Sequence, residues 1–114
     1  MKALAAKLFA AWVHKKNQKW IQNPLVAQEK TFRYLLQKAQ NTQFGKDHHF
    51  DRIESYKDFA QSVPIADYEA LRPYIEQVKD GKKDVLWPGL PLYFAKTSGT
   101  TSGVKYIPIT KESM

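Results

Sequence analysis

The chain has 114 residues, the size of one small domain, and 43% of them are hydrophobic, which is typical of a globular protein rather than a disordered one. It contains no cysteine, which excludes a disulfide framework, a thiol nucleophile and a cysteine zinc site. The formal net charge is +7, and no apolar run approaches the roughly 20 residues of a membrane-spanning helix.

Residues 1–46 are expected to form a helical hairpin. The apolar face of a first helix, over residues 2–21, comprises Leu4, Leu8 and Trp12. Asn23 suits the N-cap of a second helix with Pro24 as its first residue, and apolar residues then recur at helical spacing to about residue 40. The start of the chain lacks the small-residue cleavage site of a secretory signal, so we expect a cytoplasmic protein.

The positive charge is concentrated in this hairpin. Residues 1–46 hold nine Lys or Arg against one acid, whereas residues 47–114 hold nine against ten. A basic end of this kind suits RNA, a membrane surface or an acidic protein partner. An exposed helical face, or a face that meets an acidic part of a longer chain, explains the same pattern. We favour this second explanation and expect no nucleic-acid partner.

Residues 47–90 are expected to form short helices and loops. Gly45 is predicted to stop the second helix, and residues 47–51 are predicted to form a loop. Adjacent His48 and His49 point in different directions and have no cysteine nearby, so we expect no metal site there.

Two capped helices follow in this middle segment. Ser55 and Asp58 have capping-box spacing for a helix over residues 55–61. Asp67 is predicted to cap a segment from Tyr68 to Lys79, in which Pro73 should break the chain into a turn followed by a helix that closes at Gly81. Residues 82–84 are expected to form an exposed turn.

Residues 91–114 carry the functional signal. Residues 92–95 and 106–109 each form a short apolar run typical of a strand, and Pro108 restricts the second to an edge, a strand start or a bulge. Between them lies a loop without large side chains. Gly99 and Gly103 can take positive φ, which allows successive N–H groups to converge on an anion. The loop also offers hydroxyl donors from Ser98, Thr100, Thr101 and Ser102, followed by the positive charge of Lys105.

This pattern predicts an α+β arrangement, in which a mainly helical N-terminal segment ends in a strand–phosphate loop–strand element. Thr110 then suits the N-cap of a helix that starts after the second strand. A flexible surface turn would have a similar composition, but apolar strands frame this loop and a lysine follows it. The spacing differs from the Walker A motif and from G-x-G-x-x-G, so it does not indicate a P-loop NTPase, a dinucleotide-binding protein or a kinase.

The loop resembles the phosphate loop of the acyl-adenylate-forming superfamily in the residues Thr97-Ser98-Gly99-Thr100-Thr101-Ser102-Gly103-Val104-Lys105. Ser102 and Val104 depart from the commoner pattern and, with Tyr106-Ile107-Pro108, are similar to one branch, the auxin-responsive-promoter family of acyl-acid amido synthetases and its bacterial relatives. The upstream runs Val63-Pro64-Ile65-Ala66-Asp67-Tyr68-Glu69 and Arg72-Pro73-Tyr74-Ile75 resemble the same branch.

The resemblance implies an enzyme in which ATP activates a carboxylic acid as an acyl-adenylate, and an amine such as an amino acid then attacks it. Residues 98–103 would hold the β- and γ-phosphates, Lys105 would act on the departing pyrophosphate, and Mg²⁺ would enter with the nucleotide. The sequence would then be the N-terminal portion of a larger adenylation domain and inactive by itself. Its unpaired strands could pair between copies.

Two other classes of function fit the residues alone. One is a non-enzymatic helical module whose basic N-terminal hairpin binds RNA or an acidic partner. The other is a phosphate-binding protein unrelated to this superfamily.

Overall fold

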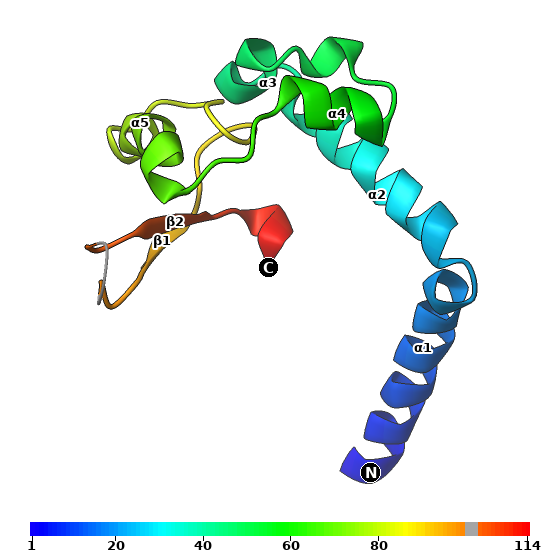
Figure 1. The fold of residues 1–114 in the computed structure, drawn as a ribbon. Coiled ribbons are helices and arrows are strands. Elements are labelled where there is room, and N and C mark those ends of the chain that lie inside the picture. Colours follow the sequence, from blue (N-terminus) through cyan, green and yellow to red (C-terminus); the bar gives the residue numbers. More distant parts are fainter. Residues whose placement is uncertain (100–102) are drawn as a thin grey trace. The chain divides into compact units, whose positions relative to one another are not determined.

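The computed structural model describes residues 1–99 and 103–114. The chain forms two compact units, Met1–Leu35 and Leu36–Met114. Helices dominate, and two strands near the C-terminus form an antiparallel sheet, which confirms the α+β class predicted from the sequence (Figure 1). Among the described residues, no helix is both long and apolar enough to cross a membrane.

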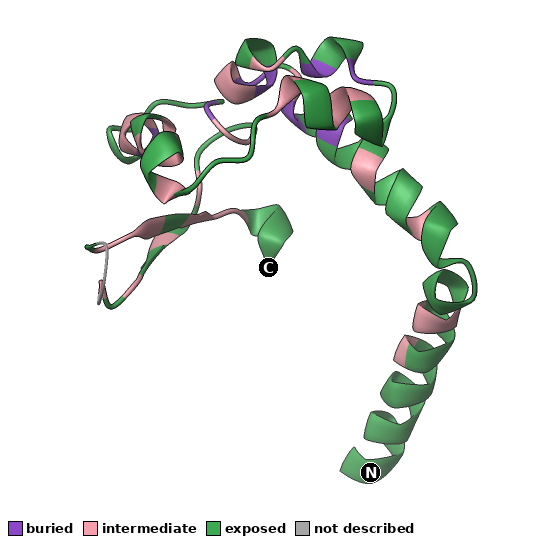
Figure 2. Ribbon diagram, viewed as in Figure 1, coloured by how far each residue is buried: buried purple, intermediate pink, exposed green. Residues whose placement is uncertain are grey.

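The first unit contains helix α1 (Lys2–Gln22) and most of helix α2 (Pro24–Ala39). Helix α1 is rich in Ala and Lys and contains no Gly or Pro, a composition that favours helix. Pro24 opens α2, where its fixed φ suits a first helical position. No residue of α1 is buried (Figure 2), and Leu8 and Trp12 are 66% and 58% exposed. Packing of the two helices as an antiparallel hairpin therefore stays a prediction.

The second unit contains the buried core. Its apolar side chains come from the end of α2, from the 3-10 turn Phe50–Arg52 and the residue after that turn, from helix α5 (Tyr68–Lys79) and from the segment that follows α5. They are Leu36, Ala39, Phe50, Ile53, Ile75, Val78 and Val85. An aromatic cluster extends this core, in which the Phe44 ring packs edge-on against Phe50 and Tyr74.

Gly45 lies inside helix α3 (Gln43–Asp47) instead of ending α2, which stops earlier at Ala39, so the sequence prediction for this glycine was wrong. A β-carbon on Gly45 would collide with the carbonyl oxygen of Ala39 and lie 2.9 Å from its carbonyl carbon. The missing side chain therefore permits close packing and is not a stop signal. The expected loop over residues 47–51 also contains the end of α3 and the start of the 3-10 turn.

The caps of the next two helices were predicted correctly. Helix α4 (Tyr56–Ser62) begins with the complete Ser55–Asp58 capping box. The Asp67 side chain accepts from Ala70 N–H at 3.0 Å at the start of α5. At its end, Gly81 has φ +89°, and its N–H and that of Lys82 return to the last helical turn as in a Schellman motif.

Pro73 does not break α5, so that prediction was wrong. The helix runs without interruption from Tyr68 to Lys79 with Pro73 inside it. Proline removes one backbone hydrogen bond from a helix interior. Burial of Ile75 and Val78, at 4% and 7% exposed, keeps this helix on the core in spite of that loss.

Strands β1 (Tyr93–Lys96) and β2 (Tyr106–Ile109) form an antiparallel ribbon, with Lys96 opposite Tyr106 and Phe94 opposite Pro108. Thr97 N–H donates to Lys105 O, and ladder alternation then makes Phe94–Pro108 a pair without mutual hydrogen bonds. Pro108 thus sits where β1 requires no N–H donor. Thr110 caps the 3-10 turn Lys111–Ser113, as its sequence position predicts. Pairing of these strands between copies stays a prediction.

Candidate phosphate-binding site

The two ends of the loop between β1 and β2 are held together by backbone and hydroxyl groups. Thr97 N–H donates to the Lys105 carbonyl oxygen at 3.0 Å, and Lys105 N–H donates to Thr97 Oγ1, also at 3.0 Å. Of the predicted site residues, Ser98, Gly99, Gly103 and Lys105 are described. Thr100, Thr101 and Ser102 lie outside the described residues, so their predicted phosphate contacts stay predictions.

Both loop glycines adopt the left-handed backbone conformation that the sequence predicts. The φ angles are +70° at Gly99 and +79° at Gly103. A β-carbon on Gly99 would approach Val104 N to 2.9 Å. Glycine is therefore needed at position 99 both for its φ angle and for close approach of the two sides of the loop.

Lys105 lies beside a small charged and aromatic cluster on the first two turns of α5. Its ammonium nitrogen is 5.9 Å from the centre of the Tyr68 ring, and the guanidinium of Arg72 is 5.3 Å from the same ring. Arg72 also donates to both carboxylate oxygens of Glu69, at 2.7 and 2.9 Å. These hydrogen bonds are the main cause that lowers the pKa of Glu69, and the positive charges of Arg72 and Lys105 lower it further. Glu69 thus offsets the charge of Arg72, and Lys105 gives this cluster its net positive charge where the loop rejoins the sheet.

Tyr68 also contacts the backbone of the residue that follows Lys105. Tyr106 N–H donates to the Tyr68 hydroxyl at 2.9 Å, and this hydroxyl donates to Tyr106 O at 3.5 Å. The two residues are 38 positions apart, so no local sequence pattern could have revealed the contact. Sequence reasoning therefore missed Tyr68 as a site residue, although its segment carries part of the family resemblance.

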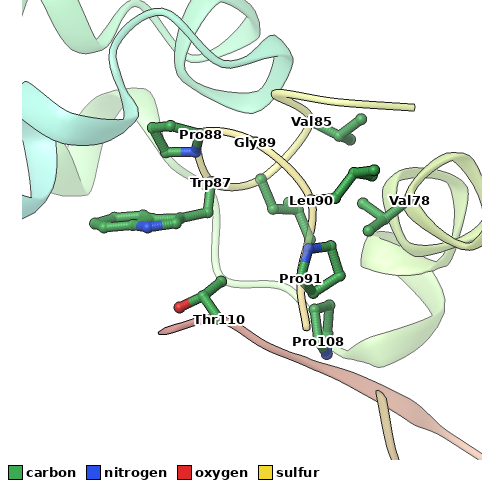
Figure 3. Close-up of a pocket in the computed structure, with 10 residues that line it drawn as sticks. Val78, Val85, Trp87, Pro88, Gly89, Leu90, Pro91, Pro108 and Thr110 are labelled. Carbon is green, nitrogen blue, oxygen red and sulfur yellow. The ribbon is translucent and has the colours of Figure 1, made fainter. Parts of the chain in front are cut away.

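The segment from Val85 to Pro91 packs against the end of β2 and encloses a small cavity (Figure 3). Figure 3 shows Pro91 and Pro108 close together and Val78 of α5 on another side. The cavity volume is about 20 Å³, enough for one water molecule. Small-molecule sites are usually some 300–1,000 Å³, so this cavity is too small to bind an acid or a nucleotide base.

His48 packs within the aromatic cluster of the second unit. Its ring centre lies 4.0 Å from that of Phe44, and Nδ1 is 2.8 Å from the Phe44 carbonyl oxygen. A carbonyl can only accept, so Nδ1 carries the hydrogen. In the part of the chain that the structure describes, no three His, Cys, Asp or Glu side chains gather in a metal-binding group.

Comparison with known proteins agrees with the resemblance carried by the loop. The family model described as the GH3 family N-terminal domain matches residues 13–114. Indole-3-acetic acid-amido synthetase GH3.2 of Arabidopsis thaliana is 31% identical over 94 residues, which cover 81% of this chain and 17% of that protein. Jasmonoyl--L-amino acid synthetase JAR6 of Nicotiana attenuata is 29% identical over 89 residues, or 76% of this chain and 15% of that protein.

A third relative matches a shorter stretch. Probable indole-3-acetic acid-amido synthetase GH3.13 of Oryza sativa subsp. japonica is 36% identical over 58 residues, which cover 49% of this chain and 12% of that protein. The chain therefore spans less than a fifth of the length of these relatives. No solved structure matches it significantly. Because the family model covers nearly the whole sequence, the chain belongs to the GH3 family, as the loop and its upstream segments predicted.

Proposed function

We propose that this chain supplies the phosphate-binding element of an ATP-dependent acyl-acid amido synthetase. The observation that carries the proposal is the closed loop between β1 and β2. Hydrogen bonds between Thr97 and Lys105 join its ends, and Gly99 and Gly103 inside it both have positive φ. Lys105 also places a positive charge at the end of the loop. Membership of a family whose curated relatives are amido synthetases supplies the class of reaction.

The reaction that we propose has two steps. A carboxylate oxygen of the acid attacks the α-phosphorus of ATP, the bond to the pyrophosphate oxygen breaks, and an acyl-adenylate forms. The nitrogen of an amine, such as an amino acid, then attacks the acyl carbon, and AMP leaves as the nitrogen loses a proton. The relatives' names suggest indole-3-acetic acid and jasmonic acid as first candidates for the acid.

Residues of the loop would act mainly in the first step. We assign the β- and γ-phosphates to the backbone N–H groups of residues 99–103 and to the hydroxyls of Ser98, Thr100, Thr101 and Ser102. Lys105 would balance the negative charge that develops on pyrophosphate, an interaction stronger in the transition state than in the ground state. The N–H, hydroxyl and ammonium groups suit phosphate oxygens, and residues 97–105 contain no carboxylate, the side chain that Mg²⁺ prefers in proteins. Mg²⁺ would therefore be carried by the phosphates of the nucleotide.

Exchange of labelled pyrophosphate into ATP tests this proposal, using the complete protein that contains residues 1–114 and a panel of carboxylic acids. We expect exchange that requires Mg²⁺ and one class of acid, and no requirement for the amine, because the amine enters only in the second step. Amide formation from the same acid and an amino acid should follow. A protein that catalyses neither exchange nor amide formation with any acid would contradict the proposal. The cytoplasmic location expected from the N-terminal sequence stays a prediction.

A further inference from the structure

We propose that Tyr68 is a positioning residue for Lys105, through its hydroxyl on the Tyr106 backbone and its ring beneath the lysine ammonium. The inference rests on the proposed function, because it names the residue that places the phosphate-binding lysine. It assigns Tyr68 no direct contact with substrate.

The geometry of the ribbon explains why the Tyr106 backbone needs a partner outside the sheet. Thr97 N–H donates to Lys105 O, so the next pair, Lys96 and Tyr106, is a pair without mutual hydrogen bonds. The N–H and C=O groups of Tyr106 consequently point away from β1. The Tyr68 hydroxyl meets both groups, at 2.9 and 3.5 Å. One side chain thereby provides hydrogen-bond partners for both outward-facing backbone groups of Tyr106, the first residue of β2.

The same side chain meets the charged end of Lys105. The ammonium nitrogen lies 5.9 Å from the centre of the Tyr68 ring, within the range of a cation–π contact. Lys105 is therefore held at two points: its backbone by Thr97 and by the fixed neighbour Tyr106, and its ammonium by the ring. A four-carbon side chain with many rotamers is in this way restricted to the region beside the loop.

Tyr68 is itself placed by the core of the second unit. It is the first residue of α5, and Asp67 caps the same turn. Farther along the helix, Ile75 and Val78 are buried. The ammonium nitrogen of Lys79 lies 4.2 Å from the centre of the Tyr106 ring. Figure 1 shows α5 beside the ribbon. A two-stranded ribbon is only marginally stable by itself, so contact with α5 fixes the end of the loop relative to the core.

Tyr68→Phe tests the inference because it removes the hydroxyl and keeps the ring. We expect the turnover number for ATP–pyrophosphate exchange to fall about tenfold, since small displacements of a catalytic group are costly, with the KM for the acid unchanged. Tyr74→Phe is the matched control. Tyr74 lies on the same helix, and its variant also loses a hydroxyl that bridges α5 to another element, but the bond is to Asp47 of α3 and does not involve the loop. This control should keep wild-type turnover.

A double variant separates positioning from a general loss of stability. If Tyr68 acts through Lys105, Tyr68→Phe should cost nothing further in a Lys105→Ala background, because the group that it positions is gone. A stability effect would reduce activity equally in both backgrounds. Equal losses in the two backgrounds, or a Tyr74→Phe loss as large as that of Tyr68→Phe, would overturn the inference.

Hydrogen exchange of the peptide that contains Tyr106 gives a readout that does not depend on activity. We expect Tyr68→Phe to accelerate amide exchange there at least several-fold and Tyr74→Phe to leave it unchanged, because the Tyr106 amide loses its acceptor only in the first variant. Unchanged exchange in Tyr68→Phe would overturn the inference. Full activity of Lys105→Ala would instead refute the role of Lys105 in the proposed function. The positioning role would fall with it, even if exchange at Tyr106 were accelerated.

Discussion

The Tyr74 hydroxyl donates to Asp47 Oδ2 at 2.7 Å and so joins α5 to α3 across 27 positions of sequence. Burial of the phenol, and then the hydrogen bond and negative charge of Asp47, raise the pKa of Tyr74 from 10.0 to about 12. The neutral phenol is therefore the form that the folded chain prefers.

This relationship predicts a pH-dependent stability. A group whose pKa is higher in the folded state stabilises the fold fully below its unfolded pKa, near 10, and loses that contribution as the pH rises through about 12. The free energy of unfolding of the wild-type protein should exceed that of Tyr74→Phe by a constant amount up to about pH 10. This difference should shrink between pH 10 and 12. Denaturant unfolding of both proteins at a series of pH values measures this. A difference that grows over that interval would contradict the shift in pKa.

Thr42 should be important for stability because its hydroxyl joins two helices in a buried position. The side chain is 1% exposed, and its Oγ1 donates to Ala39 O at 2.6 Å and accepts from Gly45 N–H at 3.0 Å. Thr42→Val keeps the shape but removes the acceptor of the Gly45 N–H and leaves the Ala39 carbonyl only the Thr42 N–H as donor, so we expect it to lower the free energy of unfolding by about 2 kcal/mol. Thr42→Ser keeps the hydroxyl and should cost clearly less. Equal losses in urea unfolding would show that the methyl group matters and the hydrogen bonds do not.

Gly45→Ala should destabilise the second unit, although alanine normally favours a helix. The added β-carbon would meet the backbone of Ala39, which cannot rotate away as a side chain could. Overpacking of this kind costs about 1–3 kcal/mol, more than the gain of roughly 1 kcal/mol in helix propensity. Lys46→Ala, at the exposed next position in α3, is the control and should change stability by less than about 0.5 kcal/mol. A Gly45→Ala protein with a raised melting temperature would refute this packing argument.

Lys105→Ala should slow adenylation strongly and leave the fold intact. Removing one donor to a developing charge typically costs about 3 kcal/mol, or roughly a hundredfold in turnover. We expect this loss in the turnover number for ATP–pyrophosphate exchange, with a smaller change in the KM for ATP. Circular dichroism and melting temperature should stay close to wild type, because the Lys105 side chain is not part of the buried core.

Lys83→Ala is the matched control for this prediction. It removes the same charge from an exposed turn and should keep nearly full activity. Lys82 is unsuitable, although it belongs to the same turn, since its ammonium donates to Gln43 Oε1 at 2.6 Å and Gln77 Oε1 at 2.9 Å and so links α3 to α5. If Lys83→Ala lost as much activity as Lys105→Ala, general surface charge and not a specific contact would explain the effect.

Residues 1–114 expressed alone should catalyse no ATP–pyrophosphate exchange. The chain spans 17% of the length of its Arabidopsis relative GH3.2, and the cavity between Val85 and Thr110 is about 20 Å³ in volume, far below the size of a substrate. Weak binding of inorganic pyrophosphate that disappears at high salt is the most that we expect. Measurable exchange by the isolated chain would show that it forms a complete adenylation site.

Features that depend on neighbours in the sequence were predicted correctly. The Ser55–Asp58 box, the Asp67 and Thr110 caps and the closure of α5 at Gly81 all satisfy backbone groups no more than five positions away. Both loop glycines likewise have the positive φ that the pattern predicts. The pattern of the loop with its upstream segments was also sufficient to identify the family.

Features that depend on packing between elements were not predicted. Gly45 was predicted to stop a helix and Pro73 to break one, but each lies inside a helix. Both predictions failed because the residue type alone does not show what packs against it. The Ala39 carbonyl at the end of α2 leaves no room for a side chain at Gly45, and burial of Ile75 and Val78 keeps α5 on the core despite Pro73. Tyr68 and Tyr106, 38 positions apart, meet because α5 packs beside β2. A local pattern records which groups need partners nearby, whereas only the tertiary structure decides which distant groups supply them.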